Sequence, residues 1–152
     1  MSDHRSDRPA ALAALDAFVG EWTVRVHLAD APAGRTVFEW ALGGQYLLQR
    51  SNTPQPDIPD SFVVMARGAE DGGYVQHYFD SRGVVRIYRM ELHGRRWTLL
   101  RSEADFSPLA FWQRFRAEFS ADGGLIEGQW ETSHDSGAHW DVDFGLTYTR
   151  VS

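Results

Sequence analysis

Apolar and polar residues alternate with a period of two through almost the whole chain after residue 20. A period of two is typical of half-buried β-strands, because successive side chains on a strand point to opposite faces. Turn residues interrupt the alternation about every 8 to 14 positions. The pattern predicts ten strands, at 21–28, 35–42, 45–52, 61–67, 74–80, 84–92, 95–102, 111–120, 125–133 and 139–150.

Ten consecutive strands with short connections favour an all-β fold, an antiparallel up-and-down β-barrel, because closure removes exposed strand edges. Before the first strand, residues 9–19 place their apolar side chains on one helical stripe, with Pro9 suited to the first turn and Asp7 to the cap. Alternate connections of a meander lie at the same end. We therefore expect the helix to plug the end with tight glycine turns, and the mouth to open among the longer, proline-containing connections.

Length and composition indicate one domain with a substantial core. The chain has 152 residues, of which 43% are hydrophobic and 13% aromatic. We expect a flexible N-terminus at 1–8 and a single barrel domain at 9–152. The net charge of −6 disfavours nucleic-acid partners, and the absence of cysteine excludes thiolate chemistry. The first 18 residues contain no apolar run long enough for a signal peptide or a membrane span, so we expect a cytoplasmic protein.

A Gly-x-Trp pair, Gly20 and Trp22, opens the first strand, and "TYTR" ends the last strand at Arg150. This arrangement resembles the calycin group of barrels, which includes lipocalins, nitrobindins and fatty-acid-binding proteins. The resemblance implies structural roles: Gly20 allows close chain approach, Trp22 fills the closed end, and Arg150 lies over its ring. The segments at 38–51 and 77–92 also resemble uncharacterised bacterial lipocalin-like proteins, so the domain is expected to be lipocalin-like.

Ten strands resemble nitrobindin-like and fatty-acid-binding barrels more than eight-stranded lipocalins. Heme-binding nitrobindins have a Gly-x-Gly-x-Gly-x-Tyr-Pro stretch after the first-strand Trp, whereas this chain has "TVRVHLADAPAG" at 23–34. We therefore expect no cofactor, and nitrobindin-like heme binding, through His77 or His139, is the third hypothesis. His134 and His139 flank a turn that holds Asp135, but a solvated loop accounts for them without a metal.

The hairpin "VQHYFDSRGVVRIY" at 75–88 is the strongest candidate for chemistry. An even-numbered loop would place His77 opposite Arg86 on the inner face, whereas a three-residue loop with Gly83 in a β-bulge would place Tyr78 opposite Arg86. We favour the first register because it turns the apolar neighbours of His77 inward.

On the following strands, Arg101 and Gln113 alternate in phase with Leu99 and Phe115, so all four are expected to face the same interior. An arginine and tyrosines inside an apolar barrel suit a carboxylate, phenolate or enolate oxygen, because burying that charge without a partner is costly. We predict ligand-binding side chains at His77, Arg86, Tyr88, Arg101, Gln113 and Phe115.

Two classes of function follow from this site. The first is binding of a small, largely apolar molecule with an anionic or carbonyl oxygen. The second is a cofactor-free isomerase or cyclase that acts on a polyketide- or polyene-like substrate, with His77 and Tyr88 as acid–base catalysts. We favour binding, because no residue pattern here is specific to catalysis. Trp112, expected outside beside a proline-containing loop, suits a portal flap or a homodimer contact.

Overall fold

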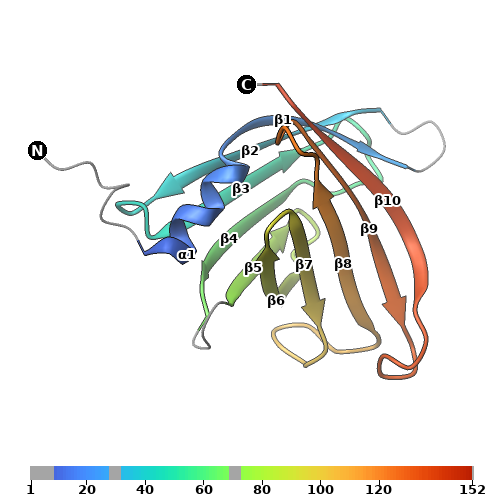
Figure 1. The fold of residues 1–152 in the computed structure, drawn as a ribbon. Helices are drawn as coiled ribbons and strands as arrows, with labels where there is room; N and C mark the ends of the chain where they lie inside the picture. The colour runs from blue at the N-terminus through green and yellow to red at the C-terminus, as the bar shows by residue number, and fades with distance from the viewer. Residues whose placement is uncertain (1–8, 28–31, 69–72, 152) are drawn as a thin grey trace, which may run out of the picture.

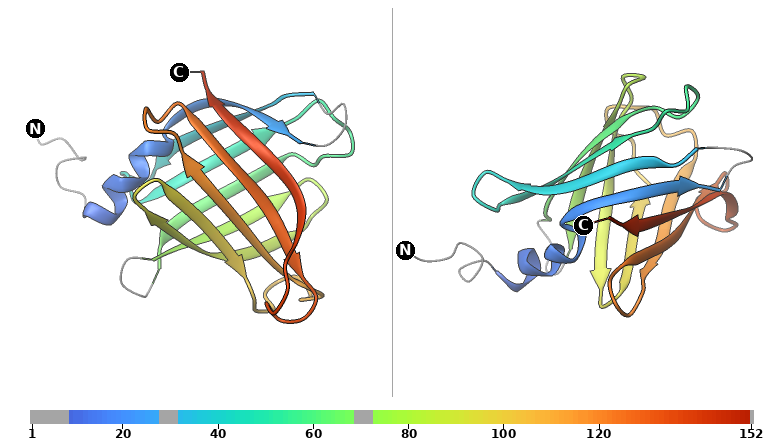
Figure 2. Two further views of the ribbon diagram at one scale, coloured as in Figure 1. Left: turned by 45° about the vertical axis from the view of Figure 1, so that its right-hand side comes forward. Right: turned by 90° about the horizontal axis from the view of Figure 1, so that it is seen from above.

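The computed structural model describes residues 9–27, 32–68 and 73–151. Its strands form a closed antiparallel barrel in which each strand pairs with its sequence neighbours and β1 pairs with β10 (Figures 1 and 2). This confirms the predicted up-and-down barrel. The strands are β1 Gly20–Val26, β2 Gly34–Ala41, β3 Tyr46–Asn52, β4 Ser61–Arg67, β5 Tyr74–Asp80, β6 Val85–His93, β7 Arg96–Arg101, β8 Trp112–Phe119, β9 Leu125–Ser133 and β10 Asp141–Arg150.

The predicted strand bounds lie within two residues of the observed ones, and those of β4, β5 and β9 are identical. The agreement reflects the local origin of the signal, because each strand carries its own alternation and its own turn residues. The predicted flexible segment at 1–8, including the expected cap Asp7, lies outside the described residues.

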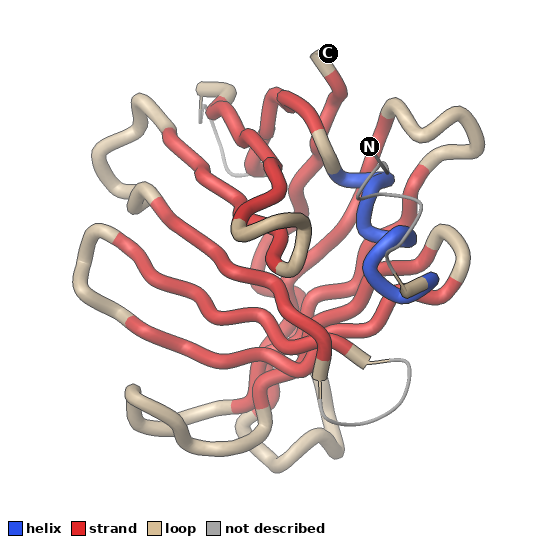
Figure 3. Tube along the Cα trace, turned by 90° about the vertical axis from the view of Figure 1, so that its left-hand side faces the viewer, coloured by secondary structure: helices blue, strands red, loops and turns tan. Residues whose placement is uncertain are grey.

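A short helix closes one end of the barrel, although only its first turn is α-helical. Helix α1 (Ala10–Ala13) continues as the 3-10 helix η1 (Ala14–Phe18), shown in blue in Figure 3. Phe18 is fully buried, and its ring contacts those of three barrel residues, Phe38, Trp97 and Phe119, at centroid distances of 5.1, 4.8 and 5.1 Å. Gly20 follows with φ of +130°, which lets the chain turn from the helix into β1. No helix in the described part of the chain is long and apolar enough to span a membrane.

The barrel closes where Trp22 of β1 pairs with Arg150 of β10. The Arg150 Cζ atom lies 4.2 Å from the centroid of the buried Trp22 ring. Its two terminal nitrogens donate hydrogen bonds to the carbonyls of Val19 and Ala17, each at 2.7 Å. The indole N–H of Trp22 donates to the Phe18 carbonyl at 2.9 Å. The first strand, the last strand and the end of the helix are thereby joined at one point.

Strand β10 contains a β-bulge that changes which of its side chains face inward. The pairing with β9 shifts between Val142 and Phe144, which leaves Asp143 as an extra residue. The alternation in the sequence predicts that Trp140, Val142, Phe144, Leu146 and Tyr148 face inward, and because of the bulge this holds only from Phe144. Val142 is 61% exposed, and Trp140 packs against the Arg114 guanidinium, with 4.1 Å from Cζ to the ring centroid.

Replacing Trp22 with Ala should lower the free energy of unfolding by about 3–5 kcal/mol, because a fully buried indole is removed from beneath Arg150. Denaturant unfolding followed by circular dichroism measures the change. Trp140→Ala, at a partly exposed ring, is the matched control and should cost clearly less. A cost below about 1 kcal/mol for Trp22→Ala would contradict its assigned role at the closed end.

Candidate ligand-binding cavity

A cavity of about 470 Å³ occupies the barrel interior, a volume typical of small-molecule sites. Residues in or beside four of the longer connections line its mouth; these are Pro32, Thr53, Ile58, Pro59, Arg82 and Phe111. The helix lies at the opposite end, against Trp97 and Phe119. The mouth is therefore at the end that the connection lengths predict.

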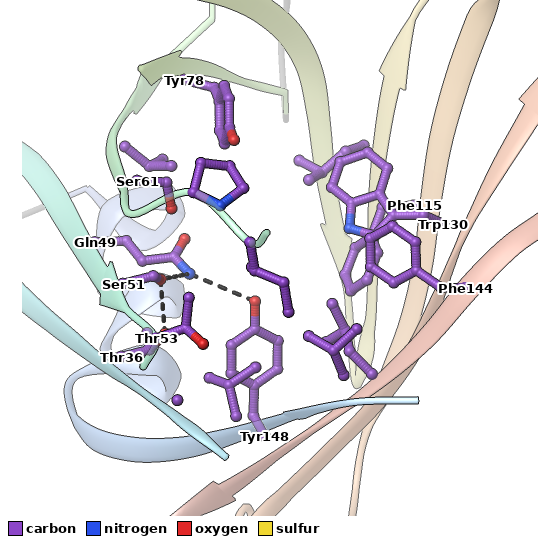
Figure 4. A pocket seen from close by; sticks show the side chains of 18 of the residues that line it. Thr36, Gln49, Ser51, Thr53, Ser61, Tyr78, Phe115, Trp130, Phe144 and Tyr148 are labelled. Carbon is purple, nitrogen blue, oxygen red and sulfur yellow. Dashed lines mark hydrogen bonds between the residues drawn. The ribbon is translucent and has the colours of Figure 1, made fainter. Parts of the chain in front are cut away.

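The cavity lining is divided by polarity. Strands β2–β6 contribute polar side chains, namely Thr36, Gln49, Ser51, Gln76, Tyr78, Arg86 and Tyr88. Strands β7–β10 contribute mainly apolar ones, namely Trp97, Leu99, Phe115, Trp130, Phe144 and Leu146. Figure 4 shows Thr36, Gln49 and Ser51 on one side and the rings of Phe115, Trp130 and Phe144 on the other. Gln113, Asp143 and Tyr148 are polar residues on the apolar side, and Val63 of β4 is an apolar residue on the polar side.

Arg86, Tyr88 and Gln113 form one polar cluster. The Gln113 side-chain carbonyl accepts hydrogen bonds from Arg86 Nη1 and from the Tyr88 hydroxyl, both at 3.0 Å. Among the described residues, Arg86 forms no ion pair, and its buried Nε–H has no hydrogen-bond partner. The cluster therefore places a cation on the wall of the cavity, with a buried donor of the same guanidinium left without a partner.

Thr36, Gln49, Ser51 and Tyr148, from strands β2, β3 and β10, form a second cluster. The hydroxyls of Thr36 and Ser51 are 2.7 Å apart, and Gln49 Nε2 lies 3.5 Å from both the Ser51 and Tyr148 hydroxyl oxygens (Figure 4). Burial raises the pKa of Tyr148 to about 12, so its hydroxyl remains protonated at neutral pH. This cluster offers neutral hydrogen-bonding groups rather than charge.

Three buried polar side-chain atoms lack a hydrogen-bond partner within the described ranges: Gln76 Oε1, Arg86 Nε and Trp97 Nε1. All three residues line the cavity. An unpaired buried polar atom destabilises a fold, and such atoms are uncommon in native proteins. The unmet hydrogen-bonding capacity of the described residues is therefore found on side chains that line the cavity.

The expected pairing of His77 with Arg86 is wrong by one residue. The observed β5–β6 register pairs Tyr78 with Arg86 and His77 with Ile87. The Asp80 N–H donates to the Val84 carbonyl, so residues 81–83 form a three-residue turn. This turn ends at Gly83, whose φ of +83° is favoured by glycine and fits a bulged hairpin. A slip of one residue exchanges the two faces of a strand, so His77 faces away from the cavity and Tyr78 faces into it.

Arg101 lies on an inward position, as expected, but its guanidinium is bound by the β7–β8 connection. Its Nε and Nη2 each lie 2.9 Å from a carboxylate oxygen of Asp105, and Nη2 also donates to the carbonyls of Ser107 and Pro108 at 2.9 and 3.2 Å. The side chains of Arg101 and Asp105 are 2% and 6% exposed. Arg101 therefore has an internal partner and does not line the cavity.

This ion pair also completes the wall between β6 and β7. The pairing of these strands ends at Arg89 and Leu100, so Val85 and Ile87 lack β7 partners. Asp105 Oδ2 accepts the Ile87 N–H at 2.8 Å, and the Ser107 hydroxyl donates to the Val85 carbonyl at 2.8 Å. The loop thus replaces the missing strand pairing on both sides of Arg86.

The hydroxyls of Tyr78 and Tyr88 remain protonated. Burial raises the pKa of both phenols, and for Tyr78 the hydrogen bond to the Asp80 carboxylate at 2.8 Å raises it further. Both rings line the cavity, 6.3 Å apart between centroids. Their protons are already donated to Asp80 and Gln113, so the two oxygens can accept hydrogen bonds from a ligand, and the protonated phenols are poor bases.

His139 lies in an exposed turn, where its Nδ1 contacts the Asp135 carboxylate. The hydrogen bond from His139 lowers the pKa of Asp135 to about 2, and Asp135 in turn raises the pKa of His139. Within the described residues, no cluster of three His, Cys, Asp or Glu side chains is arranged to hold a metal ion. The pair serves to close the β9–β10 connection.

The predicted ligand-binding set leaves out several polar side chains that line the cavity, among them Thr36, Gln49, Ser51, Gln76, Tyr78 and Tyr148. A signal for two of them was present: Gln49 and Ser51 alternate in phase with the buried Leu47, which places polar side chains on an inward face. The expected β5–β6 register places Gln76 on the outer face, so the error that placed His77 inside also placed Gln76 outside.

No protein-family model and no curated protein matches this chain. Among solved structures, it is similar to the crystal structure of Rv2717c from M. tuberculosis, with a TM-score of 0.64 and 15% sequence identity over 95% of this chain and 99% of that one. At this level of identity, the likeness shows a shared barrel fold.

Replacing Asp105 with Ala should cost about 3–5 kcal/mol of folding free energy at pH 7, because it leaves the buried Arg101 unpaired. Arg101 holds the pKa of Asp105 well below its usual range. The pair therefore stabilises the fold above the unfolded-state pKa of about 4, and this contribution is lost as the pH falls towards the lower folded-state pKa. Denaturant unfolding at pH 7 and pH 3 measures both effects.

The exposed Glu103 of the same loop provides the control, and Glu103→Ala should change stability by less than about 0.5 kcal/mol. The Asp105→Ala protein should also lose less stability than the unmodified protein between pH 7 and pH 3. Equal losses on acidification would show that Asp105 makes no such contribution.

Proposed function

We propose that the barrel binds a small, largely apolar molecule with an anionic or carbonyl oxygen, and that this oxygen lies against Arg86. The observation that carries the proposal is the state of Arg86: a guanidinium on the cavity wall with no ion pair among the described residues and with an unpartnered, buried Nε–H. A half-buried cation without a counter-charge destabilises the fold, and a bound oxygen would offset that cost.

Gln113 and Tyr88 support this assignment. Gln113 holds Arg86 Nη1 and the Tyr88 hydroxyl at one carbonyl oxygen, so the polar groups are fixed before a ligand arrives. The rings of Phe115 and Trp130, 5.1 Å apart between centroids, offer an apolar surface for the remainder of the molecule. The calycin-like placement of Gly20, Trp22 and Arg150 agrees with a ligand-enclosing barrel.

The arrangement supports binding over the alternative of a cofactor-free isomerase or cyclase. That alternative relied on His77 to move a proton, and His77 faces away from the cavity. Tyr88, the second expected catalyst, has a raised pKa, and its hydroxyl proton is donated to Gln113, so it is poorly suited to act as a base.

The cavity lining does not fit heme. No histidine of the described ranges lines the cavity, and burial raises the pKa of the three tyrosines there, which opposes the phenolate form that iron ligation requires. Both histidines considered as ligands, His77 and His139, lie elsewhere.

The cytoplasmic location and the homodimer contact at Trp112 stay predictions. The Trp112 ring packs over Gly137, where a Cβ atom would lie 2.9 Å from it, so this indole covers the β9–β10 connection.

Titration with hemin should give no stoichiometric, sharp Soret band, because the cavity lacks a suitable axial ligand among its described residues. Absorption spectra of the protein and of His77→Ala and His139→Ala variants test this. A one-to-one band that disappears in either variant would place heme binding ahead of the present proposal.

Arg86→Met should weaken binding of a fluorescent fatty acid by about 1.5–3 kcal/mol, or roughly 10- to 150-fold, because a charged hydrogen bond is lost. Fluorescence titration measures the affinity, and the methyl ester of the same acid should be much less affected. Arg89→Met, at an exposed outward position of β6, is the control and should leave binding unchanged. Unchanged fatty-acid affinity in a folded Arg86→Met protein would overturn the assignment.

A further inference from the structure

We infer that the cavity's ligand is a flat aromatic molecule with several oxygen atoms along one edge. Its oxygenated edge faces strands β2–β6, and its apolar ring system faces β7–β10. This inference rests on the proposed function and specifies its ligand class. It follows from the distribution of polar groups around the cavity, of which Arg86 is only one.

The polar wall extends across several strands rather than surrounding one point. In the strand register, Gln49 of β3 pairs with Val63 of β4, Val63 with Tyr78 of β5, and Tyr78 with Arg86 of β6. With neighbouring strands about 4.8 Å apart, Gln49 and Arg86 are separated by roughly 14 Å of barrel wall. Hydrogen-bonding groups therefore lie at both ends of a long edge.

Two adjacent rows widen this polar wall. Thr36 pairs with Ser51 and Ser51 with Ser61, which places a row of hydroxyls beside Gln49. On the other side, Gln76 pairs with Tyr88. A ligand with a single polar end would occupy one of these positions and leave the others facing hydrocarbon.

The opposite wall is suited to an aromatic ring system. The Phe115 ring lies between Trp97 and Trp130, with centroid distances of 4.9 and 5.1 Å. Gly128 leaves space for this ring, since a Cβ atom there would lie 2.7 Å from the Phe115 Cζ. Phe115 can therefore lie close to the barrel backbone and extend the apolar surface on which an aromatic ligand can pack.

A second buried polar atom of this wall supports more than one polar group on the ligand. Among the described residues, Gln76 Oε1 on β5 has no hydrogen-bond partner, and the Gln76 side chain is 3% exposed. A carboxylate at Arg86 only accepts hydrogen bonds, so it cannot satisfy this oxygen. A hydroxyl group, which both donates and accepts, suits this position.

This division distinguishes between ligand classes. A fatty acid carries its oxygens at one end and would set methylene groups against Gln49 and Gln76. A sugar carries hydroxyls on both faces and would set some against Phe115 and Trp130. An oxygenated aromatic molecule with one polar edge matches both walls.

The test compares two isomers of equal composition. Both hydroxyls of 2,7-dihydroxynaphthalene lie on one long edge, whereas those of 2,6-dihydroxynaphthalene lie on opposite edges. Calorimetric titration should show that the 2,7 isomer binds about three- to tenfold more tightly, as expected for one additional neutral hydrogen bond. Equal affinities, tighter binding of the 2,6 isomer or no binding of either would overturn the inference.

Variants then locate the oxygenated edge. Gln49→Leu and Gln76→Leu should each reduce the preference for the 2,7 isomer by about threefold or more, while Gln45→Leu, at an exposed turn position, should not change it. Circular dichroism shows whether each variant folds, and one folded cavity variant is enough to carry out the test. A preference that persists in a folded cavity variant would contradict the assigned polar wall.

The fatty-acid titration separates this inference from the proposed function. If the fatty acid binds through Arg86 but the two isomers bind equally, the proposed function stands and the aromatic ligand class is wrong. If Arg86→Met leaves fatty-acid binding unchanged, the proposed function itself is wrong.

Discussion

The structure depends on how Arg150 joins the two ends of the chain. The end of a helix leaves backbone carbonyls without hydrogen-bond partners. Here the Arg150 guanidinium donates hydrogen bonds to the carbonyls of Ala17 and Val19, and it also covers the Trp22 ring. The same side chain therefore secures the β1–β10 closure and the helical plug. With Phe18 held in the barrel end by these contacts, the interior remains accessible from the end that carries the longer connections.

A barrel interior that contains both glutamines and tryptophans must satisfy two conflicting requirements. Apolar side chains stabilise the fold by leaving water, whereas buried polar atoms destabilise it unless they are paired. The Thr36–Ser51 and Arg86–Gln113 contacts meet part of the second requirement internally. Among the described residues, the buried polar atoms without a partner belong to Gln76, Arg86 and Trp97, all of which line the cavity, so the unmet requirement lies in the cavity wall.

The strands and the position of the mouth could be predicted because alternation and turn residues are local signals. The β5–β6 register could not, since it depends on whether Gly83 adopts positive φ, and one residue of slip moved His77 outside and Tyr78 inside. The bulge at Asp143 changed the phase of β10 in the same way. The predicted inward position of Arg101 was correct. Its partner, Asp105, lies in an irregular loop, and no periodicity in the sequence of a loop indicates which of its side chains packs against the barrel.

The Arg101–Asp105 pair links the loop to the site even though it does not contact the cavity. Asp105 accepts the Ile87 N–H and Ser107 donates to the Val85 carbonyl, so the backbone on both sides of Arg86 is held by loop side chains instead of by β7. The position of the Arg86 guanidinium therefore depends on a neighbouring ion pair that is itself buried. Of the two arginines that the sequence predicts in the cavity, Arg86 lines it. Arg101 instead holds the loop that supports β6, the strand that carries Arg86.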